Sequence, residues 1–415
     1  MLNYTDASGG AARAAVRLQD GLAARGVETA MMVRVKASPD GPAQGPETPW
    51  GRAVTRLRWA LDKAPLWRYR ARDEVPFSTL WFPDRLARRI NGLRPDLIHI
   101  HWIGHGYMDL ASLARLDAPL VWTLHDAWPF TGGCHIPLSC ERYRDRCGAC
   151  PRLGSTREQD LSRRLWERKQ RIWPQLDVTL VTPSAWLAGC ARASTLLQGR
   201  RVEVIPNGLD LDCFRRQDRQ AARARFGLPQ GVQLILFATA SSRRVPHKGF
   251  DLLEVALQRL APERPTAVVT AGTAAMVRSL PAGLAVYPVG DVREDAAMAA
   301  LYAAADVTVV PSRQENLPQV AVESLACGTP VVAFNTAGIP EVITHQQTGY
   351  LATPFDPEAL GAGLRWVLAD PERYGRLSAA AREKAVRDFG RDRQAARYHA
   401  LYQERLDAQK EAHAP

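Results

Sequence analysis

Short runs of apolar residues alternate with amphipathic stretches along most of this chain. A short apolar run bounded by Gly, Pro or polar residues is typical of a strand buried in a parallel sheet. Such runs lie at residues 27–35, 95–102, 120–126, 178–183, 234–239, 267–272, 285–290, 306–311 and 330–334. The amphipathic stretches, for example residues 12–24, 161–172 and 251–260, predict helices between them. Strands that alternate with helices predict an α/β fold.

The order of strand, glycine-containing loop and helix occurs twice, which predicts two Rossmann-like domains. It begins at residues 1–6, before Gly9 and Gly10, and begins again at residues 234–239, before the loop 241–249. A chain of 415 residues is also too long for one ordinary core. We therefore expect a first domain over 1–206 with an insert at 131–153, a second domain over 207–378, and a terminal helical segment over 379–415.

Two carboxylates, Glu315 and Glu323, belong to a stretch that predicts a helix between two buried strands. Eight residues are about two helical turns, which places the pair on one side and ~10 Å apart along the axis. We expect Pro318 in the first turn of this helix. The free N–H groups of that turn, near Asn316 and Leu317, lie between the two carboxylates and favour an anion. A ligand with a sugar, a diphosphate and a ribose would fit this layout. The spacing alone, however, favours an amphipathic helix with two solvated glutamates.

The residues around this pair carry a longer pattern. Glu-x7-Glu is followed by Ala-Cys-Gly-Thr-Pro-Val-Val and then by Gly-Ile-Pro-Glu-Val-Ile at 338–343. The ordered pattern resembles the retaining glycosyltransferases of family 4, which use nucleotide-sugar donors on a GT-B fold. The resemblance implies two Rossmann-like domains that face a cleft, with the last helix crossing back to the first domain. It also implies that Glu315, Asn316 and Leu317 hold the donor sugar and that Glu323 binds the ribose.

The resemblance assigns three loops to the donor as well. The Arg-x4-Lys spacing of the family picks out Arg243 and Lys248, whose cations suit a diphosphate. Gly9 and Gly10 let backbone N–H groups approach a phosphate without a clash with Cβ. The loop that contains Asp291 lies where the family holds the nucleobase. A solvated basic loop and a plain tight turn are the alternatives for the first two loops.

Two expected strands of the first domain end in residues suited to catalysis or binding. Residues 95–102 end in His101 and Trp102, and residues 120–126 end in His125 and Asp126. Ligands of open α/β sheets collect at the carboxyl ends of strands. The resemblance places His125 beside the donor sugar. Asp126 would orient His125 or meet the acceptor, and His101 and Trp102 are further acceptor-side candidates.

Four of the seven cysteines fall within the insert, at Cys134, Cys140, Cys147 and Cys150. In a reducing compartment a cluster with Cys-x2-Cys favours a structural zinc over a disulfide, with His135 as an alternative ligand. Thiols or disulfides that pin a loop are the other interpretation. No Asp-x-Asp pair stands at a strand end, so we expect no cofactor for catalysis. The insert resembles a subgroup of the family associated with polysaccharide assembly.

Charge and hydropathy bear on the partners. The net charge of +11 suggests an anionic partner, and in the absence of a nucleic-acid motif we favour a nucleotide and a membrane surface over nucleic acid. Neither a long apolar run nor a signal peptide is present, so we expect a cytoplasmic protein, peripheral on the inner face of the cell membrane. Residues 52–72, with Trp59, Trp67 and Tyr69, suit a helix that lies on anionic lipid. A solvated helix with its aromatics in the core is the alternative.

Together these features predict an enzyme that moves a hexose, with retention, from a UDP- or GDP-sugar to a saccharide or lipid-linked saccharide. The pathway would be of the exopolysaccharide or lipopolysaccharide type. Two other functions remain open at this stage. One is a nucleotide-sugar epimerase or hydrolase of the same architecture, and the other is a non-catalytic nucleotide-binding scaffold at a membrane.

Overall fold

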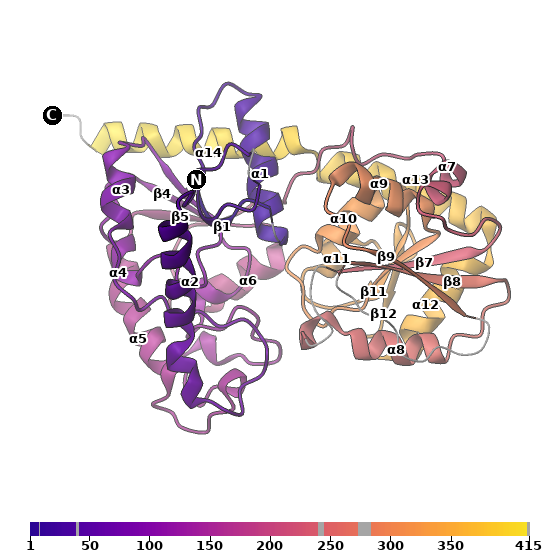
Figure 1. The fold of residues 1–415 in the computed structure, drawn as a ribbon, viewed down its shortest axis with the longest axis horizontal. Helices are drawn as coiled ribbons and strands as arrows, with labels where there is room; N and C mark the ends of the chain where they lie inside the picture. The colour runs from indigo at the N-terminus through magenta and orange to yellow at the C-terminus, as the bar shows by residue number, and fades with distance from the viewer. Residues whose placement is uncertain (8, 39–40, 240–244, 273–283, 413–415) are drawn as a thin grey trace. The chain divides into compact units, whose positions relative to one another are not determined.

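The computed structural model describes residues 1–7, 9–38, 41–239, 245–272 and 284–412. The chain forms two compact units (Figure 1). Unit 1 comprises Met1–Gly208 together with the last helix, and unit 2 comprises Leu209–Arg391. Each unit contains a six-stranded sheet, so the α/β prediction is confirmed.

The sheet of unit 1 has the strand order β2-β1-β3-β4-β5-β6, and all its paired strands are parallel. The strand order reverses between β1 and β3. In open α/β sheets, ligands bind at the carboxyl ends of strands beside such a reversal. The strands are β1 (Leu2–Thr5), β2 (Met32–Val35), β3 (Ile98–Ile100), β4 (Leu120–Thr123), β5 (Val178–Thr182) and β6 (Val202–Val204).

Helices cover both faces of this sheet. On one face, Leu18 of α1 and Tyr398 of α14 share a buried cluster with Val121 and Val181 of the strands. On the other face, Trp122 packs with residues of α4 and α6. The helices of unit 1 are α1 (Gly10–Ala23), α2 (Pro49–Lys63), α3 (Leu86–Gly92), α4 (Leu110–Leu113), α5 (Leu161–Ile172), α6 (Ala185–Ala193) and α14 (Arg391–Ala412).

The sheet of unit 2 repeats the architecture, with the order β12-β11-β10-β7-β8-β9 and a reversal between β7 and β10. All its paired strands are parallel. The strands are β7 (Gln233–Thr239), β8 (Thr266–Gly272), β9 (Ala285–Gly290), β10 (Val307–Val310), β11 (Val331–Phe334) and β12 (Gly349–Ala352). The helices are α7 (Arg219–Arg225), α8 (Phe250–Gln258), α9 (Asp295–Ala304), α10 (Gln319–Ala326), α11 (Ile339–Val342), α12 (Pro357–Ala369) and α13 (Pro371–Asp388).

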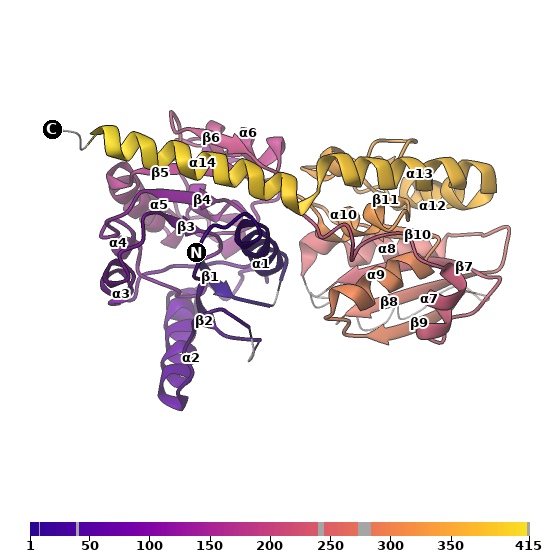
Figure 2. The ribbon, with the colours of Figure 1, turned by 90° about the horizontal axis from the view of Figure 1, so that it is seen from above.

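The return of the chain to unit 1 begins later than residue 379, where we expected it. Helix α13 stays in unit 2, because Ala381 and Ala385 are buried in its core and Arg382 donates hydrogen bonds to the carbonyls of Phe214 and Ala326. Helix α14 then lies along unit 1 (Figures 1 and 2). The first boundary also shifts, from residue 206 to Gly208. In the described ranges, no helix is both long and apolar enough to cross a membrane.

Candidate active site

In unit 2, a cation and a carboxylate meet where the strand order reverses. Lys248 ends a 3-10 turn, Pro246–Lys248, that follows β7 in the chain, and Glu315 follows the neighbouring strand β10. The Nζ atom of Lys248 lies 2.7 Å from Oε1 of Glu315, and Ser312 donates a hydrogen bond of 2.9 Å to the same oxygen. Both side chains of the ion pair keep partial exposure, so a ligand can reach them.

Two glycines allow the loops that carry this pair to approach closely. Gly249 has φ of +64°, and a Cβ atom there would lie 1.8 Å from the carbonyl oxygen of Pro311. A Cβ atom on Gly338 would lie 1.7 Å from the carbonyl oxygen of Asn316. No side chain fits at either position, so the glycines bring the loops after β7 and β11 against the loop after β10.

The electrostatics of the pair favour its charged form. Burial raises the pKa of Glu315, but the charge of Lys248 and the hydrogen bonds of Lys248 and Ser312 outweigh it, so the pKa lies below its usual value. Burial, followed by the charge of Lys248, lowers the pKa of His247 to about 4. His247 is therefore a neutral neighbour of an ion pair at pH 7. His247 and Ser312 were not predicted as site residues, although both lie within three residues of a predicted one.

Glu323 differs from Glu315 in its surroundings. It lies inside α10 with no exposed surface, and Tyr302 of α9 donates a hydrogen bond of 2.9 Å to its Oε2. Helix α10 starts later than we expected, because Pro318 is the N-cap and Gln319 is the first helical residue. Asn316 and Leu317 therefore belong to the loop before the helix, which is held by a hydrogen bond from the N–H of Gly338 to the carbonyl of Glu315.

Of the two further residues predicted for the donor, Asp291 lies away from the pair. Arg243 lies outside the described residues. Asp291 follows β9, the edge strand that β8 separates from β7. Its carboxylate pairs with the exposed guanidinium of Arg293 at 2.7 Å.

In unit 1, a pocket of about 400 Å³ lies at the carboxyl ends of β1, β3 and β4. Gly9, with φ of +90°, is the N-cap of α1. Of the residues that the sequence suggests for the site, Gly9, Gly10, Trp102, His125 and Asp126 line this pocket. The lining residues are Asn3, Tyr4, Thr5, Gly9, Gly10, Ala11, Ala12, Trp102, His105, His125 and Asp126.

Asp126 accepts three hydrogen bonds. The indole Nε1 of Trp102 donates to its Oδ2 at 2.6 Å, His135 Nδ1 lies 2.7 Å from the same oxygen, and the N–H of Trp128 donates to Oδ1 at 2.9 Å. Burial raises the pKa of Asp126, but His135 and the donors outweigh it, so the carboxyl titrates below its usual value. The carboxylate is therefore ionised and fixed in orientation.

Two of the predicted histidines pair with each other. His101 Nδ1 lies 3.0 Å from His125 Nε2; the ring of His101 is buried and that of His125 is half-buried. Burial lowers the pKa of His125 to about 4 and holds that of His101 well below its usual value. Both rings are therefore neutral at pH 7. His101 is covered by the rings of His99 and His125, so it supports the site from beneath and does not line the pocket.

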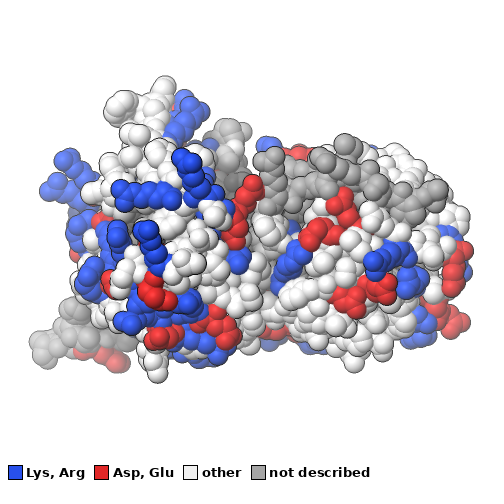
Figure 3. All heavy atoms as spheres, turned by 90° about the horizontal axis from the view of Figure 1, so that it is seen from below, with Lys and Arg blue, Asp and Glu red and all other residues white. Residues whose placement is uncertain are grey.

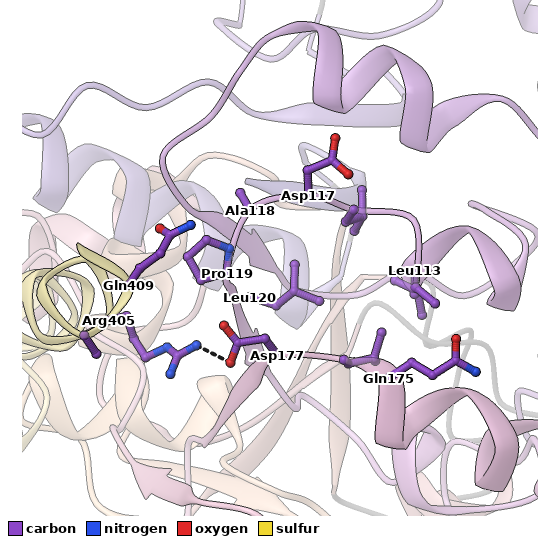
Figure 4. Close-up of a pocket in the computed structure, with 13 residues that line it drawn as sticks. Leu113, Asp117, Ala118, Pro119, Leu120, Gln175, Asp177, Arg405 and Gln409 are labelled. Carbon is purple, nitrogen blue, oxygen red and sulfur yellow. Dashed lines mark hydrogen bonds and ion pairs between the residues drawn. The ribbon is translucent and has the colours of Figure 1, made fainter. Parts of the chain in front are cut away.

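A second pocket of unit 1, of about 420 Å³, contains none of the predicted site residues. It lies at the opposite edge of the sheet, where the chain enters β4 and β5 (Figure 4). Its walls expose more polar than apolar surface, and Arg405 of α14 pairs there with Asp177 at 2.5 Å.

Known proteins resemble the chain over both units. The family described as Glycosyltransferase Family 4 matches residues 8–213, and the family described as Glycosyl transferases group 1 matches residues 218–384. The D-inositol 3-phosphate glycosyltransferase of Thermobispora bispora is 36% identical over 335 residues, which cover 76% of this chain and 72% of that protein. The enzyme of the same name from Xylanimonas cellulosilytica is 38% identical over 329 residues, covering 74% and 71%.

The chain belongs to glycosyltransferase family 4. Solved structures agree in fold. Sucrose-phosphate synthase of Thermosynechococcus elongatus has a TM-score of 0.67 at 21% identity and covers 97% of this chain and 94% of its own. Anabaena HepE in complex with UDP and glucose has a TM-score of 0.66 at 17% identity and covers 97% and 99%. The GT-B prediction for this family 4 glycosyltransferase is thereby confirmed.

The Cys-rich insert of this family 4 chain packs beneath the pocket of unit 1. The thiols of Cys134, Cys147 and Cys150 are buried, Cys140 is partly exposed, and all four are free. Burial raises the pKa of Cys147 to about 12, and the N–H of Gly132 donates to its sulfur at 3.1 Å. Among the described residues, no group of three or more His, Cys, Asp or Glu side chains stands in an arrangement that would hold a metal ion. The structural zinc therefore stays a prediction from sequence.

Helix α2 and the turn after it form an exposed aromatic and basic surface, which we call the α2 surface. Its aromatic members are Trp50, 78% exposed, Trp59, and Trp67, 70% exposed. Arg56 and Arg68 are also exposed there. The alternative that these tryptophans belong to the core is therefore wrong. Figure 2 shows α2 projecting from the sheet of unit 1, and Figure 3 shows Lys and Arg side chains spread over unit 1.

Not every aromatic or basic residue of this segment faces solvent. Tyr69 accepts a hydrogen bond of 2.9 Å from the N–H of Leu161. Arg58 is buried and donates to the carbonyls of Gly106, Pro83 and Phe82. These two residues hold the segment onto unit 1.

Proposed function

We propose that this enzyme moves a hexose from a UDP- or GDP-sugar to a hydroxyl group of a saccharide or lipid-linked saccharide, with retention of configuration. The observation that carries the proposal is the Lys248–Glu315 pair at the switch point of unit 2. The ammonium of Lys248, helped by Arg243, stabilises the negative charge that develops on the departing diphosphate. The carboxylate of Glu315 and the backbone at Asn316 and Leu317 bind hydroxyls of the sugar.

The remaining donor contacts are assigned by position. Glu323, whose side chain has no exposed surface in this structure, is assigned to the ribose hydroxyls by the family pattern alone, and the loop that contains Asp291 is assigned to the base. Gly9 and Gly10 lie at the N-terminus of α1, which favours the diphosphate. His125, which lines the unit 1 pocket, is assigned to the side of the donor sugar. No side chain is assigned as a nucleophile, so retention requires that the hydroxyl attack the face of the sugar from which the diphosphate departs.

The acceptor that we propose differs from the one in the names of the relatives. The curated relatives are named for D-inositol 3-phosphate. We propose instead an acceptor in exopolysaccharide-type or lipopolysaccharide-type assembly. The described lining of the unit 1 pocket contains the carboxylate of Asp126 and no Lys or Arg that would bind a phosphate.

We further propose that the α2 surface docks on anionic lipid at the inner face of the cell membrane. Tryptophans bury apolar area at a membrane interface, and arginines are attracted to anionic headgroups. Trp50 and Trp67 are largely exposed, and Arg56 and Arg68 lie in the same segment. Docking of this kind holds the enzyme at a surface where a lipid-linked acceptor is concentrated.

A donor and acceptor screen tests the function. The protein is incubated with UDP- and GDP-hexoses, alone and with inositol 3-phosphate, octyl glycosides or lipid-linked saccharides in vesicles, and nucleotide release is measured. We expect release to depend on a saccharide acceptor, and proton NMR of the product to show the anomeric configuration of the donor. A free epimer without an acceptor would indicate an epimerase, and transfer to inositol 3-phosphate alone would contradict the proposed acceptor.

A further inference from the structure

Asp126 has one hydrogen-bonding position left for a ligand. An ionised carboxylate offers about four lone-pair sites. Trp102, His135 and Trp128 occupy three of them. The side chain is 19% exposed and lines the pocket at the ends of β1, β3 and β4. The remaining site can accept a hydrogen bond from a hydroxyl group in that pocket.

His135 of the Cys-rich insert fixes the direction of this carboxylate. Because an ionised carboxylate only accepts, His135 Nδ1 carries the proton that is donated to Asp126. The other ring nitrogen, Nε2, lies 2.8 Å from the hydroxyl of Ser78. That hydroxyl in turn accepts a hydrogen bond of 3.0 Å from the N–H of His105. The imidazole is therefore held at both nitrogens, and it is 3% exposed.

The backbone around His135 is fixed as well. Phe77 and Cys134 form an antiparallel bridge between the segment before α3 and the insert. The N–H of His135 donates to the carbonyl of Pro76, and its carbonyl accepts from the N–H of Ala127, both at 3.0 Å. Gly133, with φ of +128°, lies so close to Phe77 that a Cβ atom would be 2.4 Å from its ring. The insert thus fixes the position of His135. His135 does not line the pocket, so it does not contact the ligand directly.

The lining of the pocket indicates the chemical class of this ligand. Tyr4, Trp102 and His105 present rings that meet edge to face, at centroid distances of 4.9 to 5.7 Å. Rings of this kind pack against the C–H face of a sugar, while a carboxylate binds its hydroxyls. The described lining has no cation, and a phosphate beside Asp126 would be repelled. The end of the pocket that favours an anion is at Gly9 and Gly10, which the proposed function gives to the donor.

We propose that Asp126, aimed by His135 of the Cys-rich insert, binds a hydroxyl group of an uncharged saccharide acceptor in the unit 1 pocket. The inference rests on the proposed function and names its acceptor class. Asp126 is the residue that touches the acceptor. His135 is a positioning residue, and Ser78 orients it.

Conservative variants of His135 separate positioning from mere support of the fold. The amide nitrogen of Asn occupies the place of Nδ1 and can still donate to Asp126, whereas that of Gln occupies the place of Nε2 and cannot. Transfer from UDP-glucose and from GDP-mannose is measured onto octyl β-glucoside, octyl β-galactoside, octyl α-mannoside and inositol 3-phosphate. We expect transfer onto at least one octyl glycoside. For that glycoside, His135→Gln should raise KM at least tenfold, and His135→Asn should stay within about threefold of the wild type.

Asp126→Asn and Ser78→Ala extend the series. Asp126→Asn should raise the KM for the acceptor more than His135→Gln does, and Ser78→Ala should raise it less. The dissociation constant for UDP, measured by calorimetry, should be unchanged in all four variants, because the Lys248–Glu315 pair belongs to unit 2. Equal thermal melting of His135→Asn and His135→Gln shows that a difference between them does not come from folding.

Three results would overturn the inference. They are transfer onto inositol 3-phosphate alone, no transfer onto any octyl glycoside, and an equal acceptor KM for His135→Gln, His135→Asn and the wild type. Hydrolysis of the donor in the absence of an acceptor is measured as well. It distinguishes a failure of this inference from a failure of the proposed function. If Lys248-dependent release of UDP or GDP persists, only the acceptor assignment is wrong; if it is absent, the proposed function is wrong too.

Discussion

The two units of this glycosyltransferase have the same sheet and different chemistry at its edge. Both sheets have six parallel strands whose order reverses beside the first strand, so both offer a binding site at the same place. In unit 2 that place holds the Lys248–Glu315 ion pair. In unit 1 it holds aromatic rings and the carboxylate of Asp126, without a cation in the described lining. The fold therefore fixes where a ligand binds, and the residues that follow each strand decide which ligand it is.

The units also differ in how many neutral histidines they bury near the site. Unit 1 buries His99 and His101 and half-buries His105 and His125, and burial is the largest cause that lowers the pKa of each. In the described part of unit 2, burial lowers the pKa of one histidine, His247. This contrast, like the contrast in charge, can be tested.

The largest expected effect is that mild acid destabilises unit 1 more than unit 2. In the unfolded chain these histidines titrate near 6.5, whereas in the fold His125 titrates at about 4 and His105 at about 3. As the pH falls below 6.5, the unfolded state binds protons that the folded state does not. The free energy of unfolding should then drop by up to about 1.4 kcal/mol per pH unit for each histidine, and it is fully restored above 6.5.

Ten of the eleven tryptophans lie in residues 1–208, so tryptophan fluorescence reports on unit 1. Denaturant unfolding at pH 7 and pH 5 measures the change, and hydrogen exchange resolves the two units. Equal stability of unit 1 at both pH values, or opening of unit 2 first, would contradict this prediction.

The second largest effect is expected for the metal content, because only unit 1 contains the Cys-rich insert. If the insert holds zinc, protein purified without added metal should contain about one equivalent per chain. Cys147→Ser should lose the metal together with several kcal/mol of unit 1 stability, because a structural site contributes its binding energy to folding. Cys213→Ser in unit 2 is the matched control and should keep the metal. If the insert contains no metal and four titratable thiols, the zinc hypothesis is wrong and the four cysteines are free thiols.

Removal of the cation from unit 2 should reduce the rate. Lys248→Ala should lower kcat by about 10²–10³-fold and change the KM for the donor much less, because the ammonium acts most on the charge of the transition state. Steady-state kinetics with varied donor measures both constants. Arg259→Ala, which removes an exposed cation paired with Glu358, is the control. A normal kcat at saturating donor would show that Lys248 only supports the loop.

The buried carboxylate of unit 2 should affect binding more moderately. Glu323→Gln should weaken UDP binding by about 1–3 kcal/mol, because the ribose loses a charged acceptor. Tyr302→Phe keeps the carboxylate and removes the hydrogen bond to its Oε2, so it should affect stability more than affinity. Calorimetry with UDP and thermal melting measure the two effects. An unchanged affinity of Glu323→Gln for UDP would show that Glu323 does not bind the donor.

The smallest effect per residue is expected at the α2 surface. Changing Arg56 and Arg68 to Gln should weaken attachment to anionic liposomes by about 1 kcal/mol each, and added salt should do the same. Flotation with liposomes of graded anionic content measures it. The same change at Arg259 and Arg293 of unit 2 is the charge-matched control. Equal recovery with neutral and anionic liposomes would exclude docking.

Much of the fold was available from the sequence. The apolar runs predicted the strands because a strand buried on both faces leaves a continuous apolar signature. The glycines at 249 and 338 mark backbone contacts that admit no Cβ atom, and Lys248 and Glu315 were identified from their family pattern. The start of α10 and the beginning of the return to unit 1 were placed wrongly, because they depend on a cap and on buried alanines that periodicity does not resolve.

The sequence by itself determined the two α/β repeats, the family and the residues that follow each strand, because these are encoded locally by periodicity and by short ordered motifs. Only the tertiary structure decided the partners. His135 lies 57 residues from Ser78, and His99 lies 303 residues from Tyr402, yet each pair is in hydrogen-bond contact. The burial of Arg58 and the exposure of Trp67 were likewise invisible in the sequence. Contacts at such separations depend on how the sheet orders its strands and on which helix covers them, and neither is encoded in a local pattern.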